Sequence, residues 1–173
     1  MNSHFKVPCL RLGTLLLFCY LLANASYGQK SDKVALLRSN EIQRKAHMEN
    51  NAALLVSQIA DSMINVDKGD ISTLSNEEIK TRFESYFKVV KYTRWDDLQA
   101  PIIQISGDGN WAVMFVKKLI DLQYIDQDGN LGAHHYAQFA WESRYHKIDG
   151  EWKIVSISST DKTLTESEAA QFK

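Results

Sequence analysis

Three side chains of this sequence could carry acid–base chemistry: Asp121, His135 and His47. Asp121 interrupts a stretch of mostly apolar residues that resembles a strand, and His47 stands at the start of an apolar helical stripe. A carboxyl or imidazole group in an apolar environment has a shifted pKa, which suits proton transfer near neutral pH. We therefore expect these side chains to line a pocket. The alternatives are an exposed ion pair between Asp121 and Lys117, and a histidine on the surface.

The residues around His135 alternate as expected for a strand from Ala133 to Lys147. One face of this strand carries the more apolar set of side chains, which includes His135, Trp141 and Tyr145. That face should point toward the helices and toward any cavity, so we predict that these three side chains bind a ligand there. The alternative for the two aromatic residues is ordinary core packing.

Metal and nucleotide chemistry are not expected. Adjacent strand residues such as His134 and His135 point to opposite faces, so they cannot easily bind one ion together. The segment from Asp126 to Gly129 resembles the start of a calcium loop, but its twelfth position is Ala137 instead of glutamate, so a hairpin turn explains it better. No glycine-rich phosphate loop and no Ser-His-Asp order is present. We therefore predict no metal and no cofactor.

The composition indicates a folded domain without a strong charge signature. Hydrophobic residues make up 45% of the 173 residues and charged residues 24%, with a net charge of −1. This apolar fraction is enough for a packed core, and the balanced charge gives no basic footprint for nucleic acid. We therefore exclude wholesale disorder and expect no nucleic-acid partner.

Residues 1–28 have the pattern of a secretory signal peptide. Lys6 and Arg11 give a positive start, the run from Leu15 to Leu22 is apolar but short, and small residues follow it. We predict cleavage near residues 25–29 and a secreted or periplasmic protein without membrane contact once the peptide is removed; an uncleaved anchor is the alternative. Both cysteines, Cys9 and Cys19, lie in this segment, so the mature chain would have no disulfide.

The rest of the chain, residues 29–173, is predicted to form one α+β domain. Apolar residues at helical spacing predict a helix from Asp32 to Val66, ended by the turn at 67–70. In the alternative, residues 29–50 form a separate, loose leading helix. Ser75 followed three residues later by Glu78 is a capping box, which predicts a second helix over 76–87.

Alternation typical of strands follows the second helix. The predicted strands are, in chain order, Lys88 to Trp95, Pro101 to Ser106, Trp111 to Ile125, Ala133 to Lys147 and Trp152 to Ser159. Asp149-Gly150 is the strongest hairpin signal, and residues 163–173 form a polar tail with a weak final helix as one option. Helices followed by hairpin-connected strands indicate N-terminal helices packed on a strongly curved, mixed or antiparallel sheet, which forms a cone with a pocket.

Four segments resemble the nuclear-transport-factor-2-like superfamily. They are AALLVSQIADSMINVDKGDI at 52–71, FESYF at 83–87, WDDLQAPIIQISGDGNWAVMFV at 95–116 and WESRYHKIDGEWKIVSISST at 141–160. More narrowly, the sequence is similar to secreted bacterial members related to polyketide cyclases and ketosteroid isomerase. The resemblance implies a cone-shaped α+β fold with an open-ended pocket, and frequently a homodimer through the outer face of the sheet. We predict such a homodimer for this chain, with Tyr136 and Gln138 in its interface. The resemblance does not imply one function.

Three functions are compatible with these patterns. The first is a non-catalytic secreted or periplasmic domain that binds an apolar or amphipathic small molecule, or a partner, because the aromatic inner face lacks a convincing catalytic set. The second is an enzyme of the isomerase, cyclase or dehydratase type that uses one acid–base group in the pocket. The third is a dimerising module with a filled cone. A carboxylate bonded to a tyrosine or histidine inside the pocket would favour the second function over the first.

Overall fold

The computed structural model describes residues 10–172, and the side chains of residues 28–172. Three helices and two strands form the first half of the chain: α1 (Leu10–Met48), α2 (Ala52–Val56), β1 (Ile59–Asp67), β2 (Asp70–Ser75) and α3 (Asn76–Phe87). Five strands and a short helix follow: β3 (Val90–Asp97), β4 (Ile102–Ile105), β5 (Trp111–Ile125), β6 (Leu131–Ile148), β7 (Glu151–Leu164) and α4 (Glu166–Ala169).

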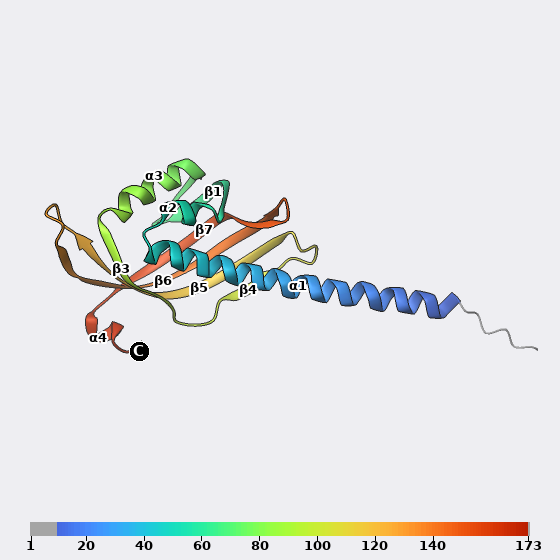
Figure 1. The fold of residues 1–173 in the computed structure, drawn as a ribbon. Helices are drawn as coiled ribbons and strands as arrows, with labels where there is room; N and C mark the ends of the chain where they lie inside the picture. Colours follow the sequence, from blue (N-terminus) through green and yellow to red (C-terminus); the bar gives the residue numbers. More distant parts are fainter. Residues whose placement is uncertain (1–9, 173) are drawn as a thin grey trace, which may run out of the picture.

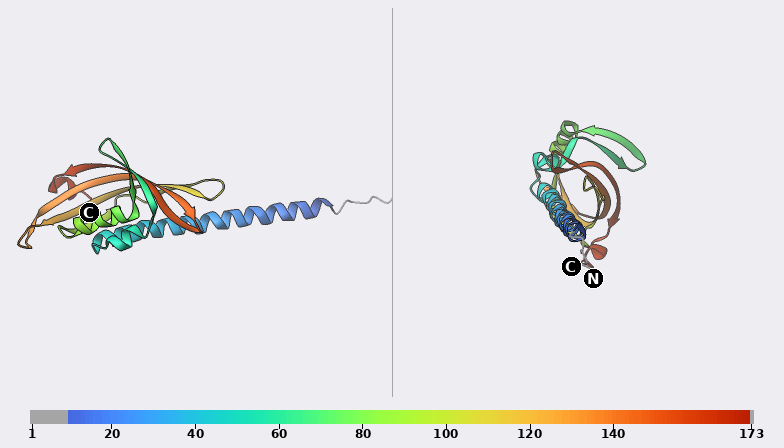
Figure 2. Two further views of the ribbon diagram at one scale, coloured as in Figure 1. Left: turned by 90° about the horizontal axis from the view of Figure 1, so that it is seen from above. Right: turned by 90° about the vertical axis from the view of Figure 1, so that its right-hand side faces the viewer.

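The strands form one mixed sheet in the order β2-β1-β7-β6-β5-β3, with β4 paired to β5. The β1–β7 pair is parallel and the remaining pairs are antiparallel. Helices α1, α2 and α3 lie on one face of the sheet, which curls over α1, while α4 lies against the opposite face (Figures 1 and 2). The predicted α+β class, with N-terminal helices packed on a mixed sheet, is therefore confirmed.

The C-terminal half of α1 is the central helix of the fold, not a loose leading helix. Its buried residues recur at helical spacing and are mostly polar: Leu36, Ser39, Asn40, Gln43, Ala46 and His47. Because they share one face of the helix, they all point toward the sheet. The alternative of a loose helix over residues 29–50 is wrong because it was based on the weak apolar periodicity there, while the buried face of this helix is mostly polar.

The N-terminal part of α1 projects beyond the sheet (Figure 1). The predicted signal peptide, residues 1–28, includes this part of α1. Its first nine residues lie outside the described residues. Within the described part of the chain, no helix is both long and apolar enough to cross a membrane. Cleavage near residues 25–29 stays a prediction.

The predicted helix from Asp32 to Val66 is wrong beyond Met48. Asn50 adopts a left-handed conformation (φ 50°), and its side-chain amide donates to the carbonyl oxygens of Phe87 and Val90 at 2.8 and 2.7 Å. This fixes the sharp end of α1, and Asn51 then caps the short helix α2. Residues 59–67 form strand β1, and the segment predicted to end the helix is the turn between β1 and β2, where both central residues, 68 and 69, have positive φ.

The other predicted elements agree well with the structure. The capping box at Ser75 and Glu78 starts α3, and β5 has the predicted bounds Trp111–Ile125. Asp149 and Gly150 both have positive φ, as a two-residue hairpin turn of type I′ requires. The tail forms the short helix α4, whose capping box is formed by Thr165 and Glu168.

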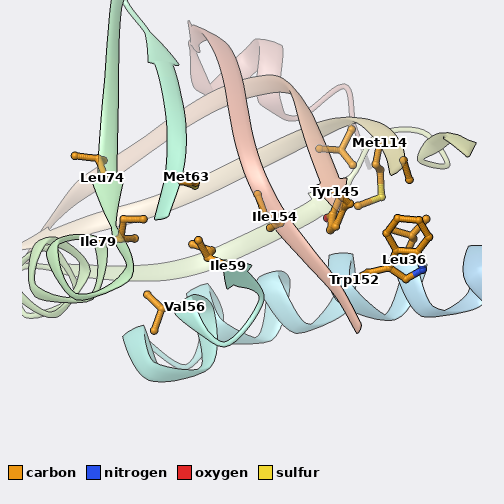
Figure 3. Packing of buried hydrophobic residues seen from close by; sticks show 12 residues of the cluster. Leu36, Val56, Ile59, Met63, Leu74, Ile79, Met114, Tyr145, Trp152 and Ile154 are labelled. Atoms are coloured by element: carbon orange, nitrogen blue, oxygen red, sulfur yellow. The ribbon is translucent and has the colours of Figure 1, made fainter. Parts of the chain in front are cut away.

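Two apolar clusters fill the space between the helices and the inner face of the sheet. The first includes Leu36, Ile79, Met114 and Ile154, and Figure 3 shows its side chains converging from the helices and strands. The second consists of residues from α1, α2, α3, β3 and β5, among them Phe87, Trp95 and Ile120. Phe83 and Trp141 pack against both clusters, so they mark the boundary between the two.

Candidate functional site

A partly open cavity of about 210 Å³ lies where the two apolar clusters meet. Every helix of the inner layer and four strands contribute to its wall. The lining residues are Gln43, His47, Leu55, Ile59, Met63, Asn65, Ile79, Phe83, Trp95, Phe139, Trp141, Ile154, Ile157 and Ser159. The wall is mainly aliphatic and aromatic, and it contains no aspartate, glutamate, lysine or arginine.

The structure brings three of the five predicted ligand residues to this site. His47 and Trp141 line the cavity directly. Tyr145 is fully buried beside it, and its hydroxyl accepts a hydrogen bond of 3.1 Å from the Gln43 amide, which also lines the cavity. Both core packing and a place in the pocket were considered for Trp141. In the structure it packs against the core clusters and also forms part of the cavity wall.

The other two predicted residues lie elsewhere. Asp121 is on the outer face of the sheet, where its Oδ1 is 2.7 Å from Nδ1 of His134. The pair is with His134 and not with Lys117, because cross-strand neighbours on one face come closer than residues spaced along one strand. His135 has the expected inward parity but is exposed, and it contacts Tyr124 edge to face at the end of the sheet. The prediction that Asp121 and His135 line the pocket is wrong.

His47 is held as a neutral imidazole with a defined tautomer. Its Nδ1 is 2.8 Å from the backbone carbonyl oxygen of Gln43, and a carbonyl can only accept, so Nδ1 carries the proton. Burial lowers the pKa of His47 to about 4, against the opposing effect of that hydrogen bond, and the positive charge of Lys118 lowers it further. The ring stacks on Trp95 with 3.7 Å between the ring centroids.

A polar cluster lies under α1 beside the cavity. The Lys118 side chain is completely buried, and its Nζ is 2.7 Å from Oδ1 of Asp97. The side-chain amide of Asn40 donates to the other carboxylate oxygen of Asp97 at 3.1 Å. Burial also raises the pKa of Tyr145 to about 12, against the opposing hydrogen bonds of neighbouring polar side chains. The Tyr145 hydroxyl therefore keeps its proton across the neutral range.

Sequence reasoning missed Gln43, Trp95, Lys118 and Asp97. Asp97 lies beyond the predicted strand end at Trp95, but it ends strand β3 and pairs with the buried lysine. Gln43 could have been found from its spacing, because residues 36, 39, 40, 43 and 47 lie on one helical face. Lys118 carries no such signal, since the sequence does not say which of two adjacent lysines faces inward.

Two further observations concern ligand sites elsewhere. Among the residues that the structure describes, no group of three or more histidine, cysteine or acidic side chains could hold a metal ion.

A wider hollow of about 820 Å³ lies on the surface, bordered by residues of α2, β1 and the β6–β7 hairpin. Charged residues such as Asp61 and Lys153 form part of its lining, so it lacks the mainly apolar wall of a small-molecule site.

Solved structures with the same arrangement of helices and sheet show which fold this chain has. An NTF2-like protein from Cytophaga hutchinsonii superimposes with a TM-score of 0.58 at 18% identity, covering 74% of this chain and 96% of that protein. The chain has the NTF2-like fold. A proposed scytalone dehydratase from Novosphingobium aromaticivorans has a TM-score of 0.63 at 11% identity, covering 81% of this chain and 92% of that protein.

The NTF2-like fold recurs in proteins with different or unknown roles. An NTF2-like protein of unknown function in nutrient uptake from Rhodospirillum rubrum has a TM-score of 0.57 at 16% identity, covering 75% of this chain and 98% of that protein. No protein-family model and no curated protein matches the chain. Likeness at such low identity shows the fold alone, so function has to be argued from the site.

Proposed function

We propose that the protein binds a small, largely apolar molecule in the inner cavity. The observation that carries this proposal is a partly open cavity of about 210 Å³ with aliphatic and aromatic walls and few polar groups. Ligand sites are typically apolar cavities in which a few polar groups set the orientation. An apolar cavity of roughly 150 Å³ is enough to hold benzene, so this space suits a molecule of about one ring.

The alternative of an acid–base enzyme has less support in the site. No carboxylate lines the cavity, and the imidazole of His47 bonds to a backbone carbonyl, not to a carboxylate that would orient a catalytic base. The carboxylate–imidazole pair of Asp121 and His134 lies on the outer face, away from the cavity. Binding without chemistry is therefore the proposal that these residues favour.

We further propose that the chain is exported after cleavage near residues 25–29. The charged start, the short apolar run and the small residues that follow support it. The packing supports it too, since the first residue of α1 in the core clusters is Leu36. Removing residues 1–28 would leave both clusters and the cavity wall in place.

Native mass spectrometry of the protein purified from its own host tests both proposals. We expect a chain that starts between Ser26 and Lys30 and that carries a co-purifying small molecule.

Ile157→Phe places a larger side chain in the cavity wall and should abolish the bound species. The overpacking should lower the free energy of unfolding by about 1–3 kcal/mol. Val66→Phe, on the opposite face of the sheet, is the matched control and should keep the ligand. A bound molecule that survives Ile157→Phe would contradict the proposed site, and retained Met1 would contradict export.

We also propose a homodimer through the outer face of the sheet. Exposed aromatic side chains on that face support it: Trp111 is 48% exposed and Phe115 38% exposed. α4 and Phe172 pack against the neighbouring cluster around Leu119 and Leu164, which includes the predicted interface residue Tyr136. The proposed interface therefore uses the part of the outer face beyond this cluster. A two-fold contact would place this patch against its own copy.

Phe115→Ser should weaken the dimer at least about tenfold, because each of two copies loses a buried aromatic ring. Light scattering over a concentration series measures the change. Ile71→Ser removes an exposed apolar residue at the far edge of the sheet and should leave the dimer unchanged. A wild-type protein that is monomeric at micromolar concentration would exclude this interface.

A further inference from the structure

We infer that the cavity selects a neutral, one-ring molecule that carries a hydroxyl group, and that Nε2 of His47 accepts the hydroxyl proton. This inference rests on the proposed binding function and names the class of ligand.

The tautomer of His47 makes Nε2 an acceptor. Nδ1–H donates to the Gln43 carbonyl oxygen at 2.8 Å, so the neutral ring presents a lone pair at Nε2. Within the described part of the chain, no protein atom forms a hydrogen bond with Nε2. Since His47 lines the cavity, Nε2 is the atom through which it can bond to a ligand.

The imidazole stays neutral because of its surroundings. The rings of Phe83, Phe87, Tyr92 and Trp95 pack around it, with centroid distances from 3.7 to 5.8 Å. Lys118, which pairs with Asp97, is also nearby, and its positive charge opposes protonation of His47. Burial raises the pKa of Tyr92 far above the neutral range, so this neighbour supplies no negative charge. His47 therefore accepts a hydrogen bond across the neutral range and does not donate one through Nε2.

The wall of the cavity restricts the rest of the ligand. With no charged side chain in the wall, an ionised ligand would be buried without a partner, which is costly, so the ligand is neutral. This excludes carboxylates and alkylammonium groups, and it leaves the hydroxyl as the donor that is neutral and strong. The indole rings of Trp95 and Trp141 line the space with Phe83 and Phe139, and flat aromatic walls suit a flat ring.

Phenol and toluene are matched probes for this inference, because they have the same ring and differ by a hydroxyl in place of a methyl group. In a purely apolar cavity the unpaired hydroxyl should weaken phenol about tenfold or more relative to toluene. With His47 as acceptor, we expect the wild-type protein to bind phenol as tightly as toluene, within about threefold. Chemical-shift titration of the tryptophan indole signals measures both dissociation constants.

Two variants of His47 separate the hydrogen bond from packing. His47→Phe keeps an aromatic ring but removes the acceptor, so phenol should weaken about tenfold while toluene changes less than about threefold. His47→Gln retains a side-chain acceptor and should keep part of the preference for phenol. Toluene binding by either variant shows that its cavity is intact, and the wild-type ratio tests the inference even if a variant does not fold.

The outcomes distinguish this inference from the proposed function. A wild-type protein that binds toluene but binds phenol at least tenfold more weakly overturns the inference and leaves the binding function standing. An equal loss of both probes in His47→Phe, or no loss of phenol in a folded His47→Phe protein, also overturns it. A wild-type protein that binds neither probe at millimolar concentration overturns the proposed function and this inference with it.

Discussion

Asp97→Ala should lower the free energy of unfolding by about 3 kcal/mol, the largest effect expected from a single polar side chain here. Asp97 is the partner of a lysine that is fully buried, with 2.7 Å between Nζ of Lys118 and Oδ1 of Asp97. Removing one partner of a buried pair leaves an uncompensated charge, which costs about 3–5 kcal/mol. The Asp97 side chain is 30% exposed, so in the variant water can enter the space that it leaves and solvate the ammonium, which keeps the loss at the lower end of that range. Urea unfolding at pH 7 measures it.

Lys118→Met is the control that isolates the charge. Replacing a buried ionic side chain with an apolar one of similar length is often neutral or stabilising, so this variant should lose less than about 1 kcal/mol. In the Lys118→Met background, Asp97→Ala should cost only the hydrogen bond from Asn40, about 1 kcal/mol. An Asp97→Ala loss that is the same in both backgrounds would show that the ion pair does not stabilise the fold.

The same buried polar layer explains why the role of α1 could not be predicted. Sequence reasoning searches for apolar residues at helical spacing, and α1 instead buries Ser39, Asn40, Gln43 and His47. A polar face is typical of a solvated helix, and only the sheet beneath shows that it is covered. The resemblance to a known superfamily predicted helices on a sheet, but it did not say which helix crosses the sheet.

Strand β1 was misread for a different reason. Ile59, Met63 and Val66 are spaced by four and three, which fits a helix. Ile59 and Met63 also lie on one face of a strand, because positions separated by an even number share a face. Pairing decides the structure: β1 forms a ladder with β2, where Met63 lies opposite Leu74, and another with β7. These partners come from distant parts of the chain, so no local pattern contains them.

Strand parity predicted part of the site and failed for the rest. On β6 the faces differ clearly, and Trp141 and Tyr145 point inward as expected. On β5 each face carries both charged and apolar residues: Lys118 points inward with Ile120, while Asp121 points outward with Leu119. α4 packs over Leu119, so the outer face of β5 is covered as well. A strand covered on both faces has no polarity difference from which to assign its sides.

Acidification from pH 7 to pH 4 should cost the protein about 3 kcal/mol of stability through His47 alone. Its pKa is about 4 in the folded protein, against 6.5 for an ordinary histidine. Above pH 6.5 both states are neutral at this residue and it contributes nothing to pH dependence. Between about pH 6.5 and pH 4 the unfolded chain binds a proton that the folded protein does not, so stability falls as the pH falls. A difference of two to three pKa units corresponds to about 3 kcal/mol.

A double comparison separates this effect from the titration of the carboxylates. The free energy of unfolding of the wild-type protein and of His47→Gln should be measured in urea at pH 7 and at pH 4.5. His47→Gln should lose about 2 kcal/mol less than the wild-type protein between the two pH values, since glutamine cannot be protonated and pH 4.5 stops short of the full shift. His135→Gln, in which an exposed histidine is replaced, should follow the wild-type protein closely. Equal losses in the wild-type protein and His47→Gln would mean that the folded protein protonates His47 as readily as the unfolded chain does, and Nε2 would then carry a proton in the pH range where we assign it as an acceptor.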